Sequence, residues 1–372
     1  MNRVLLALTF SIVPCIFCFS QFIIKGKVID KENKKPIEYA SINLDGTAVG
    51  TASNEFGEFI INIDNQYSHG KFIISSLGYA NRTIEIDSIK SPLENQLLIS
   101  LQPISSVLQE IIVKGKAASP EELLKEAIEA IPQNYLQEPF NMEFYSKMDV
   151  TDSLRTFYTI ESVLLTYRAG YVPGTMNTSK VIEKRETGTN PLSLFSDKKS
   201  KKSYFPYFPG FDISSADRIG NISAYSIFDP KSKLKLKNGG ITYFDKDTVC
   251  IIHYWKGSDN IKKTSEPRFG GTIYIATNNL AIIRHTIGIA SGSGSKDIIY
   301  KKYKMKYFPY LIQSSYTHSE KAVKYQVNQS VYLNDIILTN VTLVEHKSEN
   351  WHPDDVPFNP KYWKNRGVDV KR

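Results

Sequence analysis

Apolar and polar residues alternate with a period of two in many short runs along the chain. Because successive side chains of a β-strand point to opposite faces, this alternation predicts half-buried strands. In the first part of the chain, turn signals such as Asp45–Gly46 and Asn54–Gly57 separate the runs about every 8–12 residues. The pattern predicts a small β-sandwich of about seven strands. The clearest strands are expected at 22–29, 37–44, 59–63, 71–76, 82–86 and 96–101.

Longer alternating runs fill the second part of the chain. Residues 142–148 and 156–167 are expected to pair in antiparallel fashion around a turn at Asp152–Ser153. Asn278–Asn279 predicts a further hairpin turn. So many consecutive strands predict one large, curved, antiparallel sheet. Its later strands are expected at 248–255, 271–276, 281–287, 297–303, 310–316, 322–327 and 331–345.

Residues 119–131 carry the strongest helix signal in the chain. Ser119 suits the N-cap, Pro120 suits the first helical position, and Glu122 completes a capping box. Apolar residues recur at i, i+3, i+4 and i+7, which gives the helix one apolar stripe. Pro132 is expected to end the helix. The stripe consists of Leu124, Ala127, Ile128 and Ile131.

The composition is that of a globular protein, with 41% hydrophobic and 23% charged residues, and the length of 372 residues indicates two domains. Tyrosine and phenylalanine, with 22 and 19 residues, are plentiful, which favours sheet over helix. The formal net charge of +8 comes partly from basic runs at 198–202 and 231–237. A solvated basic face explains these runs more simply than a nucleic-acid partner, so none is expected.

Residues 1–20 have a basic residue near their start, Arg3, continue as an uncharged apolar run and end at the small Ser20. This pattern is typical of a secretory signal peptide, so we expect export by the Sec route and a mature chain that is soluble or peripheral to a membrane. The residues before Cys15 and Cys18 are not those of a lipoprotein signal, and no lipid anchor is expected. Cys250 is then the one remaining cysteine, and we expect it to pack as a small hydrophobe.

The motifs of the first domain follow a family-specific order. They are Gly26-x-Val28-x-Asp30, Pro36-Ile37-x-x-Ala40-x-Ile42, Gly46-Thr47-x-x-Gly50-Thr51, Asn54-x-x-Gly57-x-Phe59 and Ser75-Ser-Leu-Gly-Tyr79. Together they resemble the carboxypeptidase regulatory-like domain, a transthyretin-like sandwich common in envelope proteins of the Bacteroidetes. The fold expected for the whole chain is mainly β, with this sandwich, a linking helix and the large curved antiparallel sheet. Structural turn roles are expected for Gly26, Gly46, Gly50, Gly57 and Gly78.

The family name does not imply peptidase chemistry, because the regulatory domain is an accessory domain. A zinc carboxypeptidase needs His-x-x-Glu, a distant second histidine and a catalytic glutamate. His346 and Glu349 fit the first requirement, but His352 is too close in sequence to meet the second. We therefore expect a protein that is not an enzyme, and specifically not a zinc carboxypeptidase, with no catalytic residue, cofactor or metal site.

Two later segments resemble parts of other envelope proteins. Leu108-Gln-Glu-Ile-Ile-Val-Lys-Gly115 is similar to the segment that follows the same domain in TonB-dependent transporters, although a last strand paired with the sandwich edge is the simpler interpretation. The runs at 271–275 and 279–284 are similar to lipoprotein-carrier half-barrels of the LolA type, in which one helix covers a curved sheet. On that similarity the helix at 119–131 covers a concave face, which holds either an apolar ligand or a filled core.

An aromatic cluster at 204–211 is the expected ligand or partner surface, because aromatic rings stack on sugars and fill protein pockets. The tail at 351–363 is expected to form an extended aromatic strap that docks on the sheet. The rings of the cluster are Tyr204, Phe205, Tyr207, Phe208 and Phe211.

These observations predict a non-enzymatic binding or scaffolding protein of the periplasm or outer membrane. Its expected partners are envelope proteins, a glycan or an apolar ligand, and peripheral association with a membrane is compatible with the sequence. A carrier of an apolar ligand or lipid and an uncharacterised hydrolase are the two alternatives. The expected layout is a signal peptide at 1–20, the sandwich at 21–102, a linker at 103–139 and the antiparallel β domain at 140–372.

Overall fold

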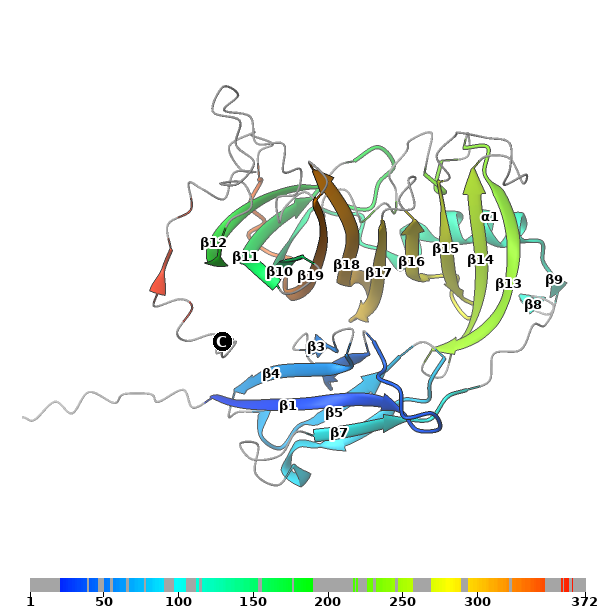
Figure 1. The fold of residues 1–372 in the computed structure, drawn as a ribbon. Helices are drawn as coiled ribbons and strands as arrows, with labels where there is room; N and C mark the ends of the chain where they lie inside the picture. Colours follow the sequence, from blue (N-terminus) through cyan, green and yellow to red (C-terminus); the bar gives the residue numbers. More distant parts are fainter. Residues whose placement is uncertain are drawn as a thin grey trace, which may run out of the picture.

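In the computed structural model the chain forms a small β-sandwich and a large curved sheet, which lies above the sandwich in Figure 1. The mainly β fold expected from the alternation is confirmed. No helix in the described part is long and apolar enough to cross a membrane. The structure describes residues 21–344 with interruptions, together with 356, 358–360 and 363. The interruptions are 39, 46–49, 54–55, 65–66, 77, 90–96, 105–111, 114–115, 153–155, 176, 190–216, 218, 220–225, 230–231, 245–246, 257–268, 289–293 and 321–322.

The sandwich consists of two facing sheets with a shared apolar core. In the first sheet β1 pairs antiparallel with β4 and parallel with β7, and in the second the order is β3-β2-β5-β6. Val28, Ile42 and Phe72, which come from both sheets, are completely buried. The strands are β1 (Gln21–Asp30), β2 (Ser41–Leu44), β3 (Gly50–Ala52), β4 (Glu58–Asp64), β5 (Lys71–Ser75), β6 (Arg82–Glu85) and β7 (Leu97–Leu101), with a 3-10 turn at Ile86–Ser88.

The glycines expected in turns fall into two groups. Gly57 and Gly78 have φ angles of 74° and 84°, which a glycine adopts without steric cost, and both lie in turns. Gly26 and Gly50 do not have positive φ angles, and both belong to strands. Gly26 lies within β1, where a Cβ would sit 2.4 Å from the Phe59 ring, and Gly50 opens β3. These two are needed for close approach, which a sequence motif does not distinguish from a turn, and Gly46 lies outside the described residues.

The large sheet has ten antiparallel strands in the order β12-β11-β10-β19-β18-β17-β16-β15-β14-β13. Neighbours in the sheet are neighbours in sequence except at one place, where β19 returns to pair with β10. The expected large antiparallel sheet is therefore confirmed. The strands are β10 (Phe140–Thr151), β11 (Thr156–Arg168), β12 (Thr178–Gly188), β13 (Lys235–Phe244), β14 (Asp247–Lys256), β15 (Phe269–Ala276), β16 (Ile282–Gly288), β17 (Gly294–Tyr303), β18 (Lys306–Glu320) and β19 (Val323–Ile337).

Helix α1 (Pro120–Glu129) begins with the expected capping box. The Ser119 hydroxyl accepts from the Glu122 backbone N–H at 3.1 Å, and the Glu122 carboxylate accepts from the Ser119 N–H at 2.9 Å. In Figure 1 the helix lies behind the half of the sheet that contains β13, β14 and β15. Its stripe is buried there at Leu124 and Ala127.

Pro132 does not end the helical segment, as had been expected from its missing N–H. A short second helix, α2 (Ile131–Asn134), begins immediately before it, and Pro132 occupies the first turn of that helix. A proline is tolerated there because the first N–H groups of a helix have no partner within the helix. Ala130, between the two helices, keeps right-handed helical dihedral angles, and Ile131 remains buried.

The junction and the tail differ from expectation. Within Leu108–Gly115 the described strand β8 (Ile112–Val113) pairs with β9 (Lys116–Ala117) and not with an edge of the sandwich. In the tail, Trp363 is buried and lies 4.8 Å from the Arg185 guanidinium, so it docks on β12 as expected. Of the described tail residues, 360 and 363 are helical and not extended, and the Trp363 N–H donates to the Asn359 carbonyl at 3.3 Å.

We expect Ser119→Ala to lower the free energy of unfolding by about 1 kcal/mol, because it removes the hydroxyl that accepts the hydrogen bond from the Glu122 N–H. Urea denaturation measures this difference. Lys125→Ala, at an exposed position of the same helix, is the control and should change stability by less than about 0.5 kcal/mol. Equal losses for the two variants would contradict a role for the box.

Candidate functional site

The sandwich contacts the face of the large sheet that is opposite to the helices. Ala52 of β3 packs against Tyr310 and Leu311 of β18 in a small buried apolar cluster. The Tyr310 hydroxyl donates to the Thr51 carbonyl at 2.9 Å. At a second point the Gly78 N–H donates to the Tyr243 carbonyl of β13 at 3.2 Å. Apolar packing and hydrogen bonds to two strands together fix the position of the sandwich on the sheet.

Lys301 of β17 also contacts the sandwich in this interface. Its Nζ donates to the Ser41 hydroxyl of β2 and is 4.3 Å from the centroid of the Tyr310 ring. Burial lowers the pKa of Lys301 to about 7, because the interface removes water from the ammonium group. In the described part of the chain no carboxylate forms an ion pair with this lysine. A cation–π contact and one hydroxyl therefore replace the solvent around the charge.

A small crevice with both polar and apolar walls lies between the two domains and includes Ser41, the hydrogen-bond partner of Lys301. Its volume is about 30 Å³, which is room for about one water molecule and far less than the roughly 300–1,000 Å³ of a small-molecule pocket. Arg284 in its wall is already paired with Asp297, with Nε 2.9 Å from Oδ1. The other lining residues are Glu38, Ser41, Ser75, Ser76, Phe244, Ile283 and Ile299.

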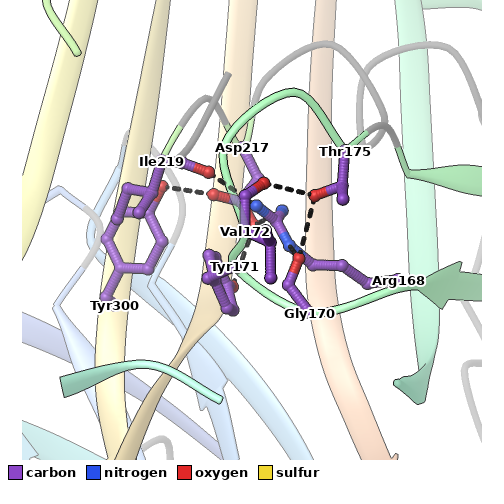
Figure 2. Close-up of polar contacts among 8 residues, drawn as sticks. All are labelled: Arg168, Gly170, Tyr171, Val172, Thr175, Asp217, Ile219 and Tyr300. Carbon is purple, nitrogen blue, oxygen red and sulfur yellow. Dashed lines mark hydrogen bonds and ion pairs between the residues drawn. The ribbon is translucent and has the colours of Figure 1, made fainter. Parts of the chain in front are cut away.

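A second polar cluster is buried against the large sheet and joins side chains of β11 and β17 (Figure 2). Arg168, the last residue of β11, donates from Nη1 to the Asp217 carboxylate at 2.6 Å, and the two side chains are 3% and 0% exposed. Tyr171 and Tyr300 donate to the two oxygens of Asp217 at 2.9 and 2.8 Å. Arg168 Nη2 also donates to the Ile219 carbonyl at 2.6 Å. Three side-chain donors thus converge on one buried carboxylate.

This cluster fits a structural role better than a catalytic one. Both oxygens of Asp217 accept hydrogen bonds, and the guanidinium of Arg168 stacks 3.6 Å above the Tyr171 ring. Burial, and then the Asp217 charge, raise the pKa values of Tyr171 and Tyr300 well above the usual range, so both stay protonated as donors. The cluster therefore fastens residues 217 and 219 to β11 and β17.

The sheet surface beneath the helices is filled by side chains. Tyr135, which follows α2, is completely enclosed, and its hydroxyl donates to the Ile282 carbonyl at 2.6 Å and accepts from the Ile282 N–H at 3.0 Å. Its ring packs against Tyr171 and Tyr300 at centroid distances of 5.0 and 6.0 Å. Leu123 and Ala127 belong to the same continuous apolar cluster. In this region the concave face holds a filled core of side chains, which is one of the two alternatives that the sequence left open.

The sequence-based candidates lie largely outside the described residues. This holds for the aromatic cluster at 204–211 and for His346, Glu349 and His352. Within the described part, no group of three or more His, Cys, Asp or Glu side chains is placed to hold a metal ion. Sequence reasoning missed Lys301 because alternation marked it only as one of several lysines near a strand end. It missed Arg168 and Asp217 because their pairing depends on the fold.

Removing one partner of the buried ion pair leaves an uncompensated charge. We expect Arg168→Met to lower the free energy of unfolding by about 3–5 kcal/mol, measured by urea denaturation. The double variant Arg168→Met/Asp217→Leu should recover much of this loss. Thr175→Ala, which removes hydrogen bonds in the same loop but leaves the ion pair intact, should cost about 1 kcal/mol. A loss for Arg168→Met no larger than that for Thr175→Ala would contradict the role of the pair.

The interface lysine predicts a pH dependence of stability. Its pKa is about 7 in the folded chain and 10.5 for an ordinary lysine, so between these values only the unfolded chain keeps the proton. Raising the pH through this window therefore favours the folded state. We expect the difference in unfolding free energy between the natural chain and Lys301→Met to increase from pH 7 to pH 10. Lys302→Met, which changes an exposed lysine, should have the same pH dependence of unfolding free energy as the natural chain. If Lys301→Met also had that same pH dependence, the lowered pKa of Lys301 would be refuted.

The solved structures to which the chain is similar include three proteins from different bacteria. An outer membrane lipoprotein-sorting protein domain from Vibrio parahaemolyticus is 10% identical, with 60% of this chain and 95% of that chain covered and a TM-score of 0.30. A LolA superfamily protein from Nitrosomonas europaea is 9% identical, with coverages of 63% and 98% and a TM-score of 0.28. A membrane-associated protein of unknown function from Bacteroides fragilis is 9% identical, with coverages of 85% and 98% and a TM-score of 0.17. The expected weak similarity to LolA-type proteins is thus found.

The comparison with curated proteins gives no match. The comparison with family models identifies one region, residues 24–113, which extends from β1 to the end of β8. It includes all seven strands of the sandwich and the motifs from Gly26 to Tyr79. The resemblance drawn from these motifs is therefore confirmed, and residues 24–113 form a CarboxypepD_reg-like domain.

Proposed function

We propose that the protein binds or scaffolds other components of the bacterial cell envelope and has no catalytic chemistry of its own. The proposal is supported by the contacts that hold the sandwich in one position on the large sheet. These contacts are made by Tyr310, Lys301 and Tyr243. A scaffold must hold its binding surfaces at a constant separation. Buried apolar contact combined with hydrogen bonds meets that requirement better than a flexible linker does.

The buried polar groups also support a role in holding the structure together. The Arg168–Asp217 pair is enclosed and its oxygens are used by protein donors. His285, buried in the sheet, shares a 2.7 Å hydrogen bond with Tyr254. Groups enclosed in this way stabilise a particular packing, whereas a catalytic acid or base must reach a substrate. A hydrolase therefore remains the weaker alternative.

A carrier of an apolar ligand would hold it between the helices and the concave face, as in a half-barrel. That position is occupied by Tyr135, Leu123 and the rest of the apolar cluster beneath the helices.

The envelope location is proposed on the apolar run of residues 1–20 and on the CarboxypepD_reg-like domain. Both features fit a protein that acts outside the cytoplasm.

Chemical cross-linking in intact cells tests the scaffolding role. We expect the natural chain to be cross-linked to a partner protein in constant proportion. Tyr310→Ala should reduce the amount of cross-linked partner to a small fraction, because this change removes both the apolar contact and the hydrogen bond to Thr51. Tyr243→Ala is the matched control, since its side chain is exposed and its carbonyl makes the contact with Gly78. Circular dichroism should show that both variants are folded.

Two results would count against the proposal. In the first, Tyr310→Ala is cross-linked to as much partner as the natural chain, although small-angle scattering shows that its two domains have separated. The other is turnover of an ester, peptide or glycoside substrate by the purified chain, which would establish catalytic chemistry.

A further inference from the structure

Three rows of polar side chains cross one face of the large sheet. Neighbouring strands lie about 4.7–4.9 Å apart, so residues that are opposite each other in successive strands form a line across the sheet. No position in these rows holds an apolar residue, and we call the three rows together the polar face. The first row is Asp297–Gln313–Ser330–Lys147–Glu161–Arg185, the second is Ser295–Ser315–Asn328–Asp149–Thr159–Thr187, and the third is Thr317–Gln326–Thr151–Thr156.

The polar face begins beside the contact with the sandwich. Leu311 of β18 packs against Ala52 of the sandwich, and the next side chains on that side of the strand are Gln313, Ser315 and Thr317. Alternate side chains of a strand point to one face of the sheet. The three rows therefore lie on the side of the sheet that carries the sandwich, opposite to the filled core beneath the helices.

The charges of the polar face compensate one another. The Lys147 ammonium is 3.1 Å from the Asp149 carboxylate, and these side chains are 33% and 29% exposed, so solvent reaches them. The other charged side chains of the rows are in the pairs Asp297–Arg284 and Glu161–Arg185. An ionic ligand meets no net charge here, and an apolar ligand meets no apolar surface. The face fits an uncharged ligand that forms many hydrogen bonds.

Amide and hydroxyl groups of β18 and β19 are held in fixed orientations. The Ser315 hydroxyl donates to Asn328 Oδ1 at 2.8 Å, and Gln326 Nε2 donates to the Ser315 hydroxyl at 2.7 Å. Gln326 Oε1 accepts from the Thr317 hydroxyl at 3.0 Å. These bonds use the oxygen of Asn328, and its Nδ2 takes no part in them. The Asn328 amide is therefore a preorganised donor for a ligand.

Gln313 of the first row is a second, independent observation that points to a ligand. Its side chain is 7% exposed, and among the described residues its Oε1 has no hydrogen-bond partner. A buried acceptor costs free energy until it finds a donor. Gln313 is opposite Ser330, so Asn328 is its diagonal neighbour, with the Cβ atoms roughly 7–8 Å apart. The face thus places an unused acceptor next to an unused donor.

We propose that the polar face binds an uncharged glycan whose sugars carry acetamido groups, with the chain of sugars lying across the strands along the second row. Sugar hydroxyls both donate and accept, as the Ser, Thr, Asn and Gln side chains of the face do. An acetamido group has one N–H donor and one C=O acceptor, which complement Gln313 Oε1 and Asn328 Nδ2. From Ser315 to Thr159 the row crosses four strands, roughly 14–15 Å, which accommodates several sugars.

Two aromatic rings border this track. Tyr145 and Tyr332 are opposite each other in the next row towards the sandwich, and their rings stack with centroids 6.2 Å apart and an interplanar angle of 28°. Both side chains are half-buried, and such rings offer a flat surface to the C–H groups of a sugar. A peptide strand is disfavoured, because the face of a sheet, unlike its edge, has no free backbone N–H and C=O groups for pairing.

The inference rests on the proposed binding role and names the class of ligand. The test measures binding of an N-acetylglucosamine hexamer to the purified full chain by calorimetry. We expect saturable binding that changes little with salt, because the face has no net charge. Asn328→Asp keeps the shape and the accepting oxygen of this side chain but removes its NH2 donor. It should bind the hexamer about tenfold more weakly, which is the effect of losing one or two hydrogen bonds.

A second variant and a control separate the loss of these groups from loss of folding. Q326A/N328A should also bind about tenfold more weakly, and circular dichroism should show that it is folded. T83A/Q102A removes an exposed hydroxyl and an exposed amide of the sandwich and should bind as the natural chain does. A glucose hexamer, which has no acetamido groups, should bind the natural chain about tenfold more weakly than the N-acetylglucosamine hexamer.

Several results would overturn the inference. They are no binding of the N-acetylglucosamine hexamer, equal binding of the two hexamers, tighter binding of a sulfated sugar polymer, and unchanged binding by both N328D and Q326A/N328A. Each of these would leave the scaffold proposal standing if the cross-linked partner still depends on Tyr310. Loss of that dependence, with hexamer binding intact, would overturn the scaffold proposal alone.

Discussion

The pairing of β10 with β19 is the constraint on which the large domain depends. It joins the strand of the sheet that comes first in the chain to the one that comes last, with Asn141 opposite Ile337 and Phe144 opposite Leu333. Each partner also carries a further run of strands, β11 and β12 on one side and β18 to β13 on the other. The apolar cluster beneath the helices includes residues of both strands, such as Phe144 and Val331. Without this ladder the two halves of the sheet have no shared core.

The two polar sites of the chain satisfy their charges in different ways. Asp217 is surrounded by the donors of Arg168, Tyr171 and Tyr300, so its burial is compensated by an opposite charge and hydrogen bonds. Lys301 has a hydroxyl and an aromatic ring as its neighbours, and burial shifts its pKa into the neutral range. The first arrangement holds one conformation over a wide range of pH. The second makes the contact between domains sensitive to protons.

Much of the fold follows from local pattern, because strand alternation, hairpin turns and the capping box at Ser119 are short-range features. Register and strand order are long-range, which is why the return of β19 to β10 and the separate β8–β9 hairpin did not follow from the sequence. The roles of Gly26 and Gly50 also depended on which atoms of other strands approach them. The candidate site was the least predictable part, since Lys301 and Ser41 come from different domains.

The return of β19 to β10 has a consequence for the order of events during synthesis. Loop closure between distant strands is slow, and it cannot begin until the second of them exists. β10 therefore waits for nearly all of the remaining strands to be made before its two neighbours are complete. The large sheet of a chain with this topology is therefore completed only after β19 has been made.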